Sequence, residues 1–388
     1  MRLLIICERF FPQRGGLAAS AGRIASGIAA RGVEAHVFCL VDDLPQGDLE
    51  TGQWNNILVH RLGKFKQNDR SYMVACRAIE LLHRRHPFDA LMGMYLVHAG
   101  YLAAMEGLLM GVPTLAMARG NDVDREMWRA EHQPFVLGAL KWATAVGGVS
   151  NELVDKCRLF GGREQVYWTP NSVDAEVFKP GEAEPELRLS LGLGKGPVVG
   201  FSGELRFKKG LHHFVEAALR ISESKSGAHF LLVGGVREDD REEYEMLLKE
   251  EPSLKQVLVE TPYIKDPGRL AAHYRLMDVL FMPSLWEGMP NAALEAMACG
   301  IPVVASDAGG LKDMVEHPKT GLLFPTGDID AAIESLTAAL AMPGDVLRAI
   351  GKRAREKVLV EFTLEKESQR ILDILNRIVN KNSPSIIV

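Results

Sequence analysis

Cysteine is scarce in this chain, and the few cysteines show no pairing pattern. The 388 residues contain five, with no C-x-x-C pair and an odd total. This excludes a disulfide framework and a zinc ribbon, and it predicts reduced thiols in a cytoplasmic protein. The cysteines are Cys7, Cys39, Cys76, Cys157 and Cys299.

Long apolar runs are also missing. No stretch of eighteen apolar residues occurs, and the first residues, MRLLIICERF, are too short for the core of a signal peptide. From this we expect neither a membrane-spanning helix nor a secretory leader. The net charge of -5 argues against general binding to nucleic acids.

Two nucleotide-binding fingerprints are absent as well. The chain has no G-x-G-x-x-G after a predicted strand and no G-x-x-x-x-G-K-[ST] phosphate loop. Gly192, Gly194 and Gly196 precede a predicted strand instead of following one. A nicotinamide dehydrogenase is therefore a poor interpretation.

Short apolar runs alternate with helical stretches along the whole chain, which predicts α/β units with parallel sheets. A polar, proline-rich break at 179–186 divides it into halves of ordinary domain size. We expect one Rossmann-like domain at 1–178 and a second at 179–360, followed by an amphipathic helix at about 361–380.

The most informative stretch runs from 279 to 310. It predicts a strand at 279–282, a loop, a helix at 291–298 and another strand at 301–305. The loop thus joins the carboxyl end of a strand to the amino end of a helix, where α/β sheets bind ligands and backbone amides attract anions. Glu287 and Glu295 would repel a phosphate but would accept hydrogen bonds from hydroxyl groups. A nucleotide-diphosphate sugar combines both kinds of group.

These residues resemble a known family. Glu287-Gly-Met-Pro-Asn291 followed by Glu295-Ala-Met-Ala-Cys-Gly-Ile-Pro-Val-Val-Ala-Ser306 is similar to the Glu-x7-Glu signature of retaining GT-B glycosyltransferases, glycosyltransferase family 4 in particular. The resemblance implies two Rossmann-like domains facing each other across a cleft. It places the donor mainly on the second domain and the acceptor on the first, and it implies that the last helix packs back on the first domain.

The resemblance also assigns the donor site. Glu287 is expected to bind hydroxyls of the transferred sugar, Glu295 those of the ribose, and Lys209 with Arg206 the diphosphate. The family arginine after Gly203 is replaced by Glu204, so Arg206 is the candidate second cation. The expected donor-binding residues are Gly16, Gly203, Arg206, Lys209, Tyr263, Ile264, Glu287, Gly288, Met289, Pro290, Asn291, Leu294 and Glu295.

On the acceptor side, the paired glycines Gly15 and Gly16 resemble the Gly-Gly loop of the family. His98 and Asp122 are further candidates, each just after a predicted strand. Arg119 stands where the family usually has a histidine close to the transferred sugar. An arginine matches a carboxylate or phosphate. Its expected partner is either an acidic neighbour, Asp122 or Asp124, or an anionic group of the substrate. Glu287, Lys209, Arg206 and Arg119 are the candidate catalytic residues.

Together these features predict a retaining, metal-independent hexosyltransferase of polysaccharide, oligosaccharide or glycolipid biosynthesis. We expect no cofactor, because cations and helix amides can neutralise the diphosphate. A UDP-sugar is favoured as donor over a GDP- or ADP-sugar, and the acceptor is a carbohydrate or a lipid-linked sugar. Basic residues in 61–70 and at 84–86 leave open a peripheral contact with the inner face of the membrane. The alternatives are a GT-B epimerase, a phosphorylase and a non-catalytic two-lobed sugar-binding module.

Overall fold

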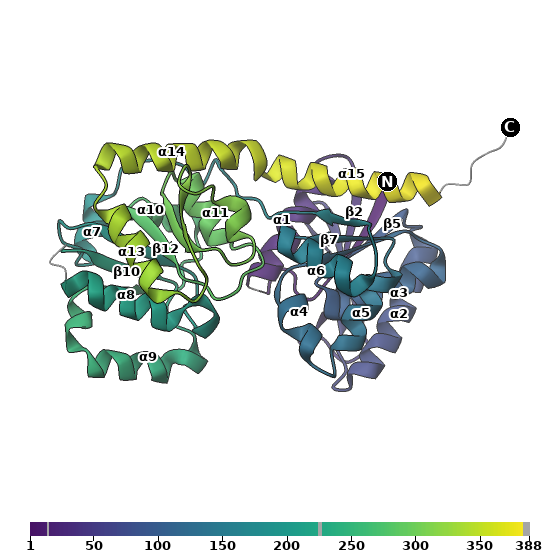
Figure 1. Cartoon of the computed structure of the whole chain (residues 1–388). Coiled ribbons are helices and arrows are strands. Elements are labelled where there is room, and N and C mark those ends of the chain that lie inside the picture. The colour runs from purple at the N-terminus through teal and green to yellow at the C-terminus, as the bar shows by residue number, and fades with distance from the viewer. Residues whose placement is uncertain (14, 224–226, 383–388) are drawn as a thin grey trace. The chain divides into compact units, whose positions relative to one another are not determined.

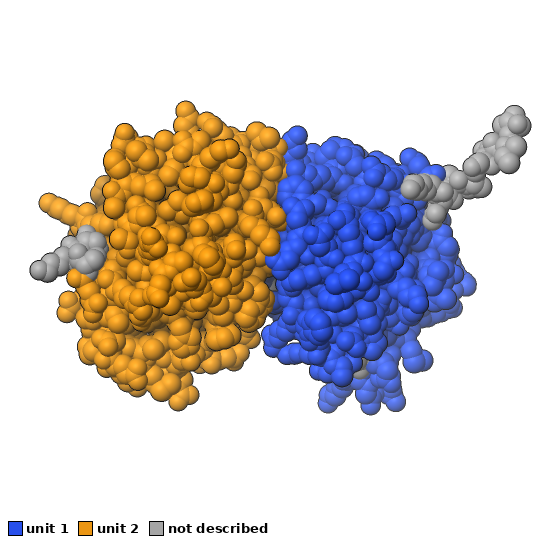
Figure 2. Space-filling model, viewed as in Figure 1, with its two compact units in different colours: residues 1–171, 364–388 blue, residues 172–363 orange. Residues whose placement is uncertain are grey.

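The computed structural model describes residues 1–13, 15–223 and 227–382, with backbone only for Asn68, Lys381 and Asn382. It divides into two compact units, drawn in blue and orange in Figure 2. Unit 1 comprises Met1–Asn171 and Leu364–Val388, and unit 2 comprises Ser172–Thr363. Each unit is an α/β domain built around a largely parallel sheet (Figure 1).

Unit 1 contains an eight-stranded sheet in the order β3-β4-β2-β1-β5-β6-β7-β8. Every neighbouring pair is parallel except β3 and β4, which form an antiparallel edge. The strands are β1 (Arg2–Cys7), β2 (Glu34–Val41), β3 (Leu49–Trp54), β4 (Ile57–Gly63), β5 (Ala90–Met94), β6 (Thr114–Ala118), β7 (Ala145–Gly148) and β8 (Val166–Trp168). The helices are α1 (Gly16–Ala29), α2 (Asn68–Arg85), the π-helix η1 (Leu96–Gly100), α3 (Tyr101–Met110), α4 (Asn121–Asp124), the 3₁₀ turn η2 (Glu126–Trp128), α5 (Gln133–Trp142), α6 (Asn151–Gly161) and α15 (Leu364–Asn382).

The central strand of unit 1 shows why this sequence forms a doubly covered sheet. Successive side chains of a strand point to opposite faces, so an apolar run can be buried on both sides. In β1, Leu3 and Ile5 join the core that includes α1 and α15, whereas Leu4 and Ile6 join the core under α2 and α3. All four side chains are almost completely buried.

Unit 2 contains a six-stranded parallel sheet in the order β11-β10-β9-β12-β13-β14. Its strands are β9 (Val198–Ser202), β10 (His229–Val233), β11 (Leu258–Thr261), β12 (Val279–Met282), β13 (Val303–Ser306) and β14 (Gly321–Phe324). Its helices are α7 (Pro185–Ser190), the 3₁₀ turn η3 (Phe207–Lys209), α8 (Leu211–Glu223), α9 (Glu238–Glu250), the 3₁₀ turn η4 (Pro252–Gln256), α10 (Pro267–Tyr274), α11 (Asn291–Ala298), α12 (Leu311–Met314), α13 (Ile329–Leu340) and α14 (Gly344–Glu361).

The division between the units falls between Asn171 and Ser172, before the expected break at 179–186. The residues in between belong to unit 2 because their backbone bonds there. The amide of Val173 donates to the Phe362 carbonyl at 2.9 Å, and Arg355 donates to the Phe178 carbonyl at 3.1 Å. The proline-rich composition of 179–186 therefore marks a surface segment of unit 2.

The last helix, α15, belongs to unit 1 and packs on α1 (Figure 1). It buries Ile371, Leu375 and Ile378 in the core that contains β1. Arg23 of α1 adds a bidentate ion pair with Glu367, at 2.8 and 3.0 Å. Among the described helices, none combines the length and the apolar character that a membrane crossing requires.

Candidate functional site

The strongest sequence motif lies where it was predicted. β12 ends at Met282 and α11 begins at Asn291, the predicted bounds, so Glu287 lies in the loop at the carboxyl end of a parallel strand. Gly309 brings a second loop against this one. Its φ is +50°, and a Cβ there would lie 1.8 Å from the Glu287 carbonyl oxygen. Only glycine allows this close approach.

Glu287 is buried among cations. Its side chain is 6% exposed and forms an ion pair with Lys209, and its other oxygen lies 3.9 Å from Nζ of Lys208. Ser284 donates its hydroxyl to Oε1 at 3.0 Å. Burial raises the pKa of Glu287, but the two lysines outweigh it, and the net pKa lies below the usual value. Glu287 therefore stays ionised at neutral pH and can accept, but not donate, a hydrogen bond.

The cationic loop that meets Glu287 follows β9. Lys208 and Lys209 end the turn η3, and the Leu285 amide donates to the Lys208 carbonyl at 2.9 Å, which ties the two loops together. Gly210 has a φ of +76°, and a Cβ there would lie 2.0 Å from the Pro283 carbonyl oxygen. The sequence therefore positions both lysines through a glycine contact with the loop that carries Glu287.

Arg206 lies at the start of the same turn. Its Nη1 is 4.0 Å from Oε2 of Glu204, a weak contact, and its buried Nε has no hydrogen-bond partner among the described residues. A buried N–H group without a partner is costly, so this guanidinium is suited to an anion. Gly203, with a φ of +115°, starts the loop after β9.

The other expected donor residues differ in how they are placed. Glu295, in α11, accepts a hydrogen bond from the Tyr274 hydroxyl at 2.7 Å. Tyr263 is exposed and Ile264 half-buried in the segment between β11 and α10. Gly288 uses its carbonyl to accept from the Gly310 amide. Pro290 precedes α11 and Asn291 begins it, whereas Met289 and Leu294 are buried in the core.

The strand ends of unit 1 form a second group of polar residues. Arg119 directly follows β6, and its Nη2 donates to Oδ1 of Asn171 at 2.7 Å. Its Nη1 is buried without a hydrogen-bond partner among the described residues. Burial lowers the pKa of Arg119 to about 10, although the charge of Glu367 opposes this. The guanidinium thus has a neutral partner and one unused donor.

The two acidic neighbours considered as partners of this guanidinium have other hydrogen-bond or ion-pair partners. Asp122 is fully buried, and its oxygens accept from the backbone amides of Leu96, Arg119 and Gly120 at 2.8–3.1 Å. Asp124 instead pairs with Lys156 at 2.6 Å. The charges of Glu367 and Asp122 nevertheless oppose the lowering of the Arg119 pKa by burial, so both carboxylates act on this guanidinium through their charge. Although Asp122-Val-Asp124 is an Asp-x-Asp sequence, both of its carboxylates are engaged in this way.

Sequence reasoning missed Glu8, which follows β1 directly. Its Oε1 accepts from the amides of His98 and Ala99 at 3.1 and 3.2 Å, and burial raises its pKa to about 7. His98 lies in the π-helix η1, with its ring hydrogen-bonded to Tyr72, and burial lowers its pKa to about 4. The sequence feature that could have identified Glu8 is its position, as a charged residue directly after a buried strand.

Glu8 and His98 line a cavity of about 250 Å³ at the strand ends of unit 1, together with Arg9, Lys64, Ser71 and Tyr72. π-helices are rare and often occur at functional sites. The preceding residue, Tyr95, has a φ of +84°, which a bulky residue seldom adopts. Gly15 and Gly16 are exposed where α1 begins.

Two of the basic residues outside the cavity, Arg61 and Arg84, form ion pairs on the surface. Arg61 contacts Asp43 at 2.5 Å and Glu50 at 3.2 Å, and Arg84 contacts Glu80 at 2.6 Å. These pairs are typical of a solvated surface and provide no specific support for a membrane-binding face.

Two family models match this chain. "Glycosyl transferases group 1" covers residues 184–357, and "Glycosyl transferase 4-like domain" covers 15–171. Together they span the greater part of both units.

Individual proteins agree with these matches. The UDP-Gal:alpha-D-GlcNAc-diphosphoundecaprenol alpha-1,3-galactosyltransferase of Escherichia coli is 29% identical over 296 residues, 73% of this chain and 74% of the relative. A GDP-mannose-dependent alpha-(1-6)-phosphatidylinositol monomannoside mannosyltransferase of Mycobacterium tuberculosis is 30% identical over 224 residues, 56% and 57%. The structure of HepE from Anabaena in complex with UDP-glucose superposes with a TM-score of 0.79 at 19% identity, covering 97% of this chain and 100% of that one. The predicted GT-B fold is confirmed.

Proposed function

Because this chain belongs to the group 1 glycosyltransferases, we propose that it transfers a sugar from a UDP-sugar to a hydroxyl of a carbohydrate or lipid-linked acceptor. GDP- and ADP-sugars are the alternative donors. The reaction proceeds with retention at the anomeric carbon and without a metal. The observation that carries this proposal is the Glu287 carboxylate, which lies between Lys208 and Lys209 in the loop directly before α11.

The arrangement in unit 2 has separate groups for the two halves of a nucleotide sugar. Lys209, Arg206 and the amides at the start of α11 supply positive charge for the diphosphate. Glu287 is ionised and accepts hydrogen bonds from sugar hydroxyls, and Glu295 does the same for the ribose. With these cations in place, the leaving diphosphate is neutralised by the chain itself.

The family resemblance supports retention. The oxygen of the leaving diphosphate takes the proton of the acceptor hydroxyl on the same face of the sugar, as the bond to the diphosphate breaks. The transition state is oxocarbenium-like, as in glycoside hydrolysis. Glu287 stabilises it through the sugar hydroxyls and does not act as an acid.

In this proposal the acceptor binds to unit 1. The guanidinium of Arg119 binds an anionic group of one of the two substrates. A buried guanidinium with a neutral partner is suited to a carboxylate or a phosphate. That group is either the donor diphosphate or the carboxylate of a uronic acid. The five unpaired cysteines and the nucleotide-sugar donor support a cytoplasmic location, with a lipid-linked acceptor reached at the inner face of the membrane.

A thermal unfolding panel with UDP-, GDP- and ADP-sugars tests the donor assignment. A ligand at one hundred times its dissociation constant stabilises the folded state by about 2.7 kcal/mol. We expect UDP-sugars to raise the unfolding midpoint, and Lys209→Ala to reduce the effect. Lys319→Ala, which removes a lysine from an exposed pair, is the matched control. No response to any nucleotide sugar would contradict the proposal.

Turnover separates the rival functions. A transferase releases nucleoside diphosphate faster when its acceptor is present, whereas an epimerase converts the donor without one. A sugar-binding module would bind donor and release nothing.

A further inference from the structure

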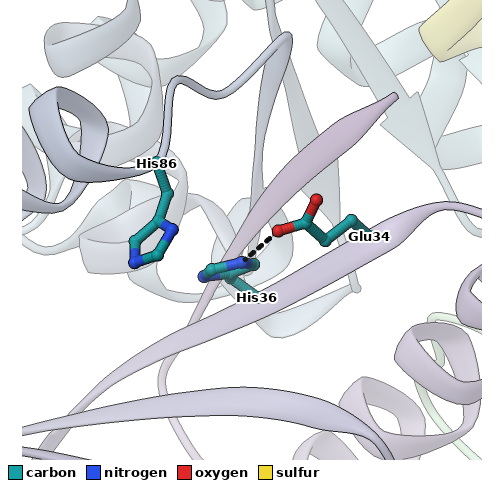
Figure 3. A group of neighbouring side chains, drawn as sticks. All are labelled: Glu34, His36 and His86. Carbon is teal, nitrogen blue, oxygen red and sulfur yellow. Dashed lines mark hydrogen bonds and ion pairs between the residues drawn. The ribbon is translucent and has the colours of Figure 1, made fainter.

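A histidine cluster lies in unit 1 at the end of the sheet where the parallel strands begin. The residues described above, Glu8 and Arg119, lie at the opposite ends of the strands. Glu34 and His36 stand two residues apart at the start of β2, so they share a face of the strand. Phe38 continues that face and packs in the core with Ala78 and Leu82 of α2. His86 directly follows α2, and the fold brings its ring beside that of His36 (Figure 3).

The three side chains converge. Each offers one ligand atom, and these atoms all lie within 4.8 Å of one another. Nε2 of His36 is 3.3 Å from Oε1 of Glu34, and the ring of His86 is tilted by 52° from that of His36, with centroids 5.2 Å apart. His36 is fully buried, His86 is half-buried and Glu34 is exposed, so the cluster opens to solvent on one side.

A chain of hydrogen bonds controls which nitrogen of His36 carries the proton. Nδ1 of His36 is 3.0 Å from Nε2 of His60, and Nδ1 of His60 is 2.9 Å from the hydroxyl of Thr51. A neutral imidazole has one N–H donor and one nitrogen acceptor, so the direction of these hydrogen bonds fixes the tautomer of both rings.

The hydrogen bonds between Thr51, His60 and His36 can be donated in two directions. In one, Thr51 donates to His60, His60 to His36, and Nε2–H of His36 to Glu34. In the other, Nδ1–H of His36 donates to His60 and Nδ1–H of His60 donates to Thr51. The second direction leaves the Nε2 lone pair of His36 beside the Glu34 carboxylate and His86. Metal-binding histidines are commonly oriented by such a hydrogen bond from their other nitrogen.

We propose that Glu34, His36 and His86 form a binding site for a divalent transition-metal ion, Zn²⁺ in particular. Two imidazoles and one carboxylate suit Zn²⁺, whereas Mg²⁺ and Ca²⁺ prefer oxygen ligands alone. Bonds of about 2.0–2.1 Å in a tetrahedron place ligand atoms roughly 3.3 Å apart. The half-buried His86 at the helix end moves inward to reach this spacing, and water takes the fourth position.

Charged residues of both signs lie near the cluster. Nε of Arg2 lies 2.7 Å from Oε1 of Glu34 and competes with the metal for that carboxylate. Asp89 adds a negative charge near Arg2, and Arg85 a positive one near His60. The two cations and two carboxylates balance, so coordination and not net charge provides the affinity. The ion would link the start of β2 to the end of α2. Its binding would therefore raise the stability of unit 1.

The test uses the full-length chain after treatment with a chelator and desalting. Calorimetric titration with Zn²⁺ should show one ion per chain, and Zn²⁺ should raise the thermal midpoint where Mg²⁺ does not. Co²⁺ at the same site should give the visible absorption of a tetrahedral complex. His86→Ala and Glu34→Gln should each weaken Zn²⁺ binding at least tenfold, and Arg2→Gln should tighten it.

His212→Ala is the matched control, because His212 is an exposed histidine of unit 2 that pairs with Glu243 and lies outside the cluster. It should leave Zn²⁺ binding unchanged. The proposal is overturned if the parent chain binds no Zn²⁺, or if His86→Ala and Glu34→Gln bind it as the parent does. It is also overturned if His212→Ala loses as much affinity as His86→Ala, which would indicate binding to surface histidines in general.

Discussion

The strand ends of the two units carry charged residues under opposite conditions. In unit 2, Glu287 lies against two lysines, and its pKa falls below the usual value despite burial. In unit 1, the guanidinium of Arg119 donates to the neutral Asn171, and the carboxylate of Glu8 accepts from two backbone amides. Burial lowers the pKa of Arg119 and raises that of Glu8, so in both residues it favours the neutral form. The charge of Glu287 in unit 2 is thus balanced by two lysines, whereas the hydrogen-bond partners of Arg119 and Glu8 named above are neutral.

Removing one partner of the balanced pair should have the largest effect. Lys209→Ala should lower turnover roughly 10²–10³-fold, the scale for one preorganised charge-stabilising donor. Because Glu287 then loses a buried counter-charge, the unfolding free energy should also fall by about 3 kcal/mol. Steady-state kinetics and chemical denaturation measure the two effects. Lys319→Ala should change neither, and a near-normal rate for Lys209→Ala would remove this lysine from the site.

The next largest effect should come from Arg119. Arg119→Lys keeps the charge but loses the planar fork, and Arg119→His loses the permanent charge, so each should cost roughly 10- to 100-fold in kcat/KM. The donor preference of Arg119→His, measured with a uronic-acid donor and its neutral counterpart, identifies the contact. A shift toward the neutral sugar indicates the uronic carboxylate, and an equal loss indicates the diphosphate. Unchanged kinetics in both variants would show that Arg119 does not touch the substrate.

A smaller effect is expected at Glu295. If it binds the ribose, Glu295→Ala should raise the donor KM roughly tenfold and leave kcat nearly unchanged, because that contact is equal in ground and transition states. Tyr274→Phe, which only removes the hydrogen bond that orients Glu295, should raise KM by less. A collapse of kcat at constant KM would instead assign Glu295 to the chemistry.

The smallest effect should be a change in the pH dependence of stability. The pKa of Glu8 is about 7 in the folded chain and near 4.5 when unfolded. Between these values the folded state binds more protons, so Glu8 makes the chain less stable as pH rises from about 4.5 to 7. Glu8→Gln should therefore gain in thermal midpoint relative to the parent over this range. A constant difference between pH 4.5 and 8 would contradict the raised pKa.

Local patterns in the sequence predicted unit 2 well. β12 and α11 have the predicted bounds. The apolar run of β12 ends at Pro283, and α11 lies between Pro290 and Gly300. The same loop chemistry placed Glu287 and Lys209 on adjacent loops. Their direct ion pair could not be predicted, since it depends on the contact between Gly210 and Pro283.

Unit 1 was harder to predict because its polar contacts join distant segments. Asn171 accepts a hydrogen bond from Arg119 from 52 positions away, a contact that no local pattern in the sequence indicates. His36, His60 and His86 meet only through strand pairing and the placement of α2. The antiparallel β3–β4 edge was missed as well, since exposed β3 lacks an apolar pattern.

The most direct test of the central claim is hydrogen–deuterium exchange with the nucleotide sugar that gives the largest thermal shift. The account predicts added protection of the backbone amides at 203–210 and 284–291 in unit 2, where the cationic loop meets the loop of Glu287. Lys209→Ala should lose that protection, and Lys319→Ala should keep it. Protection confined to unit 1, or none in either loop, would contradict a donor site at Glu287 and Lys209.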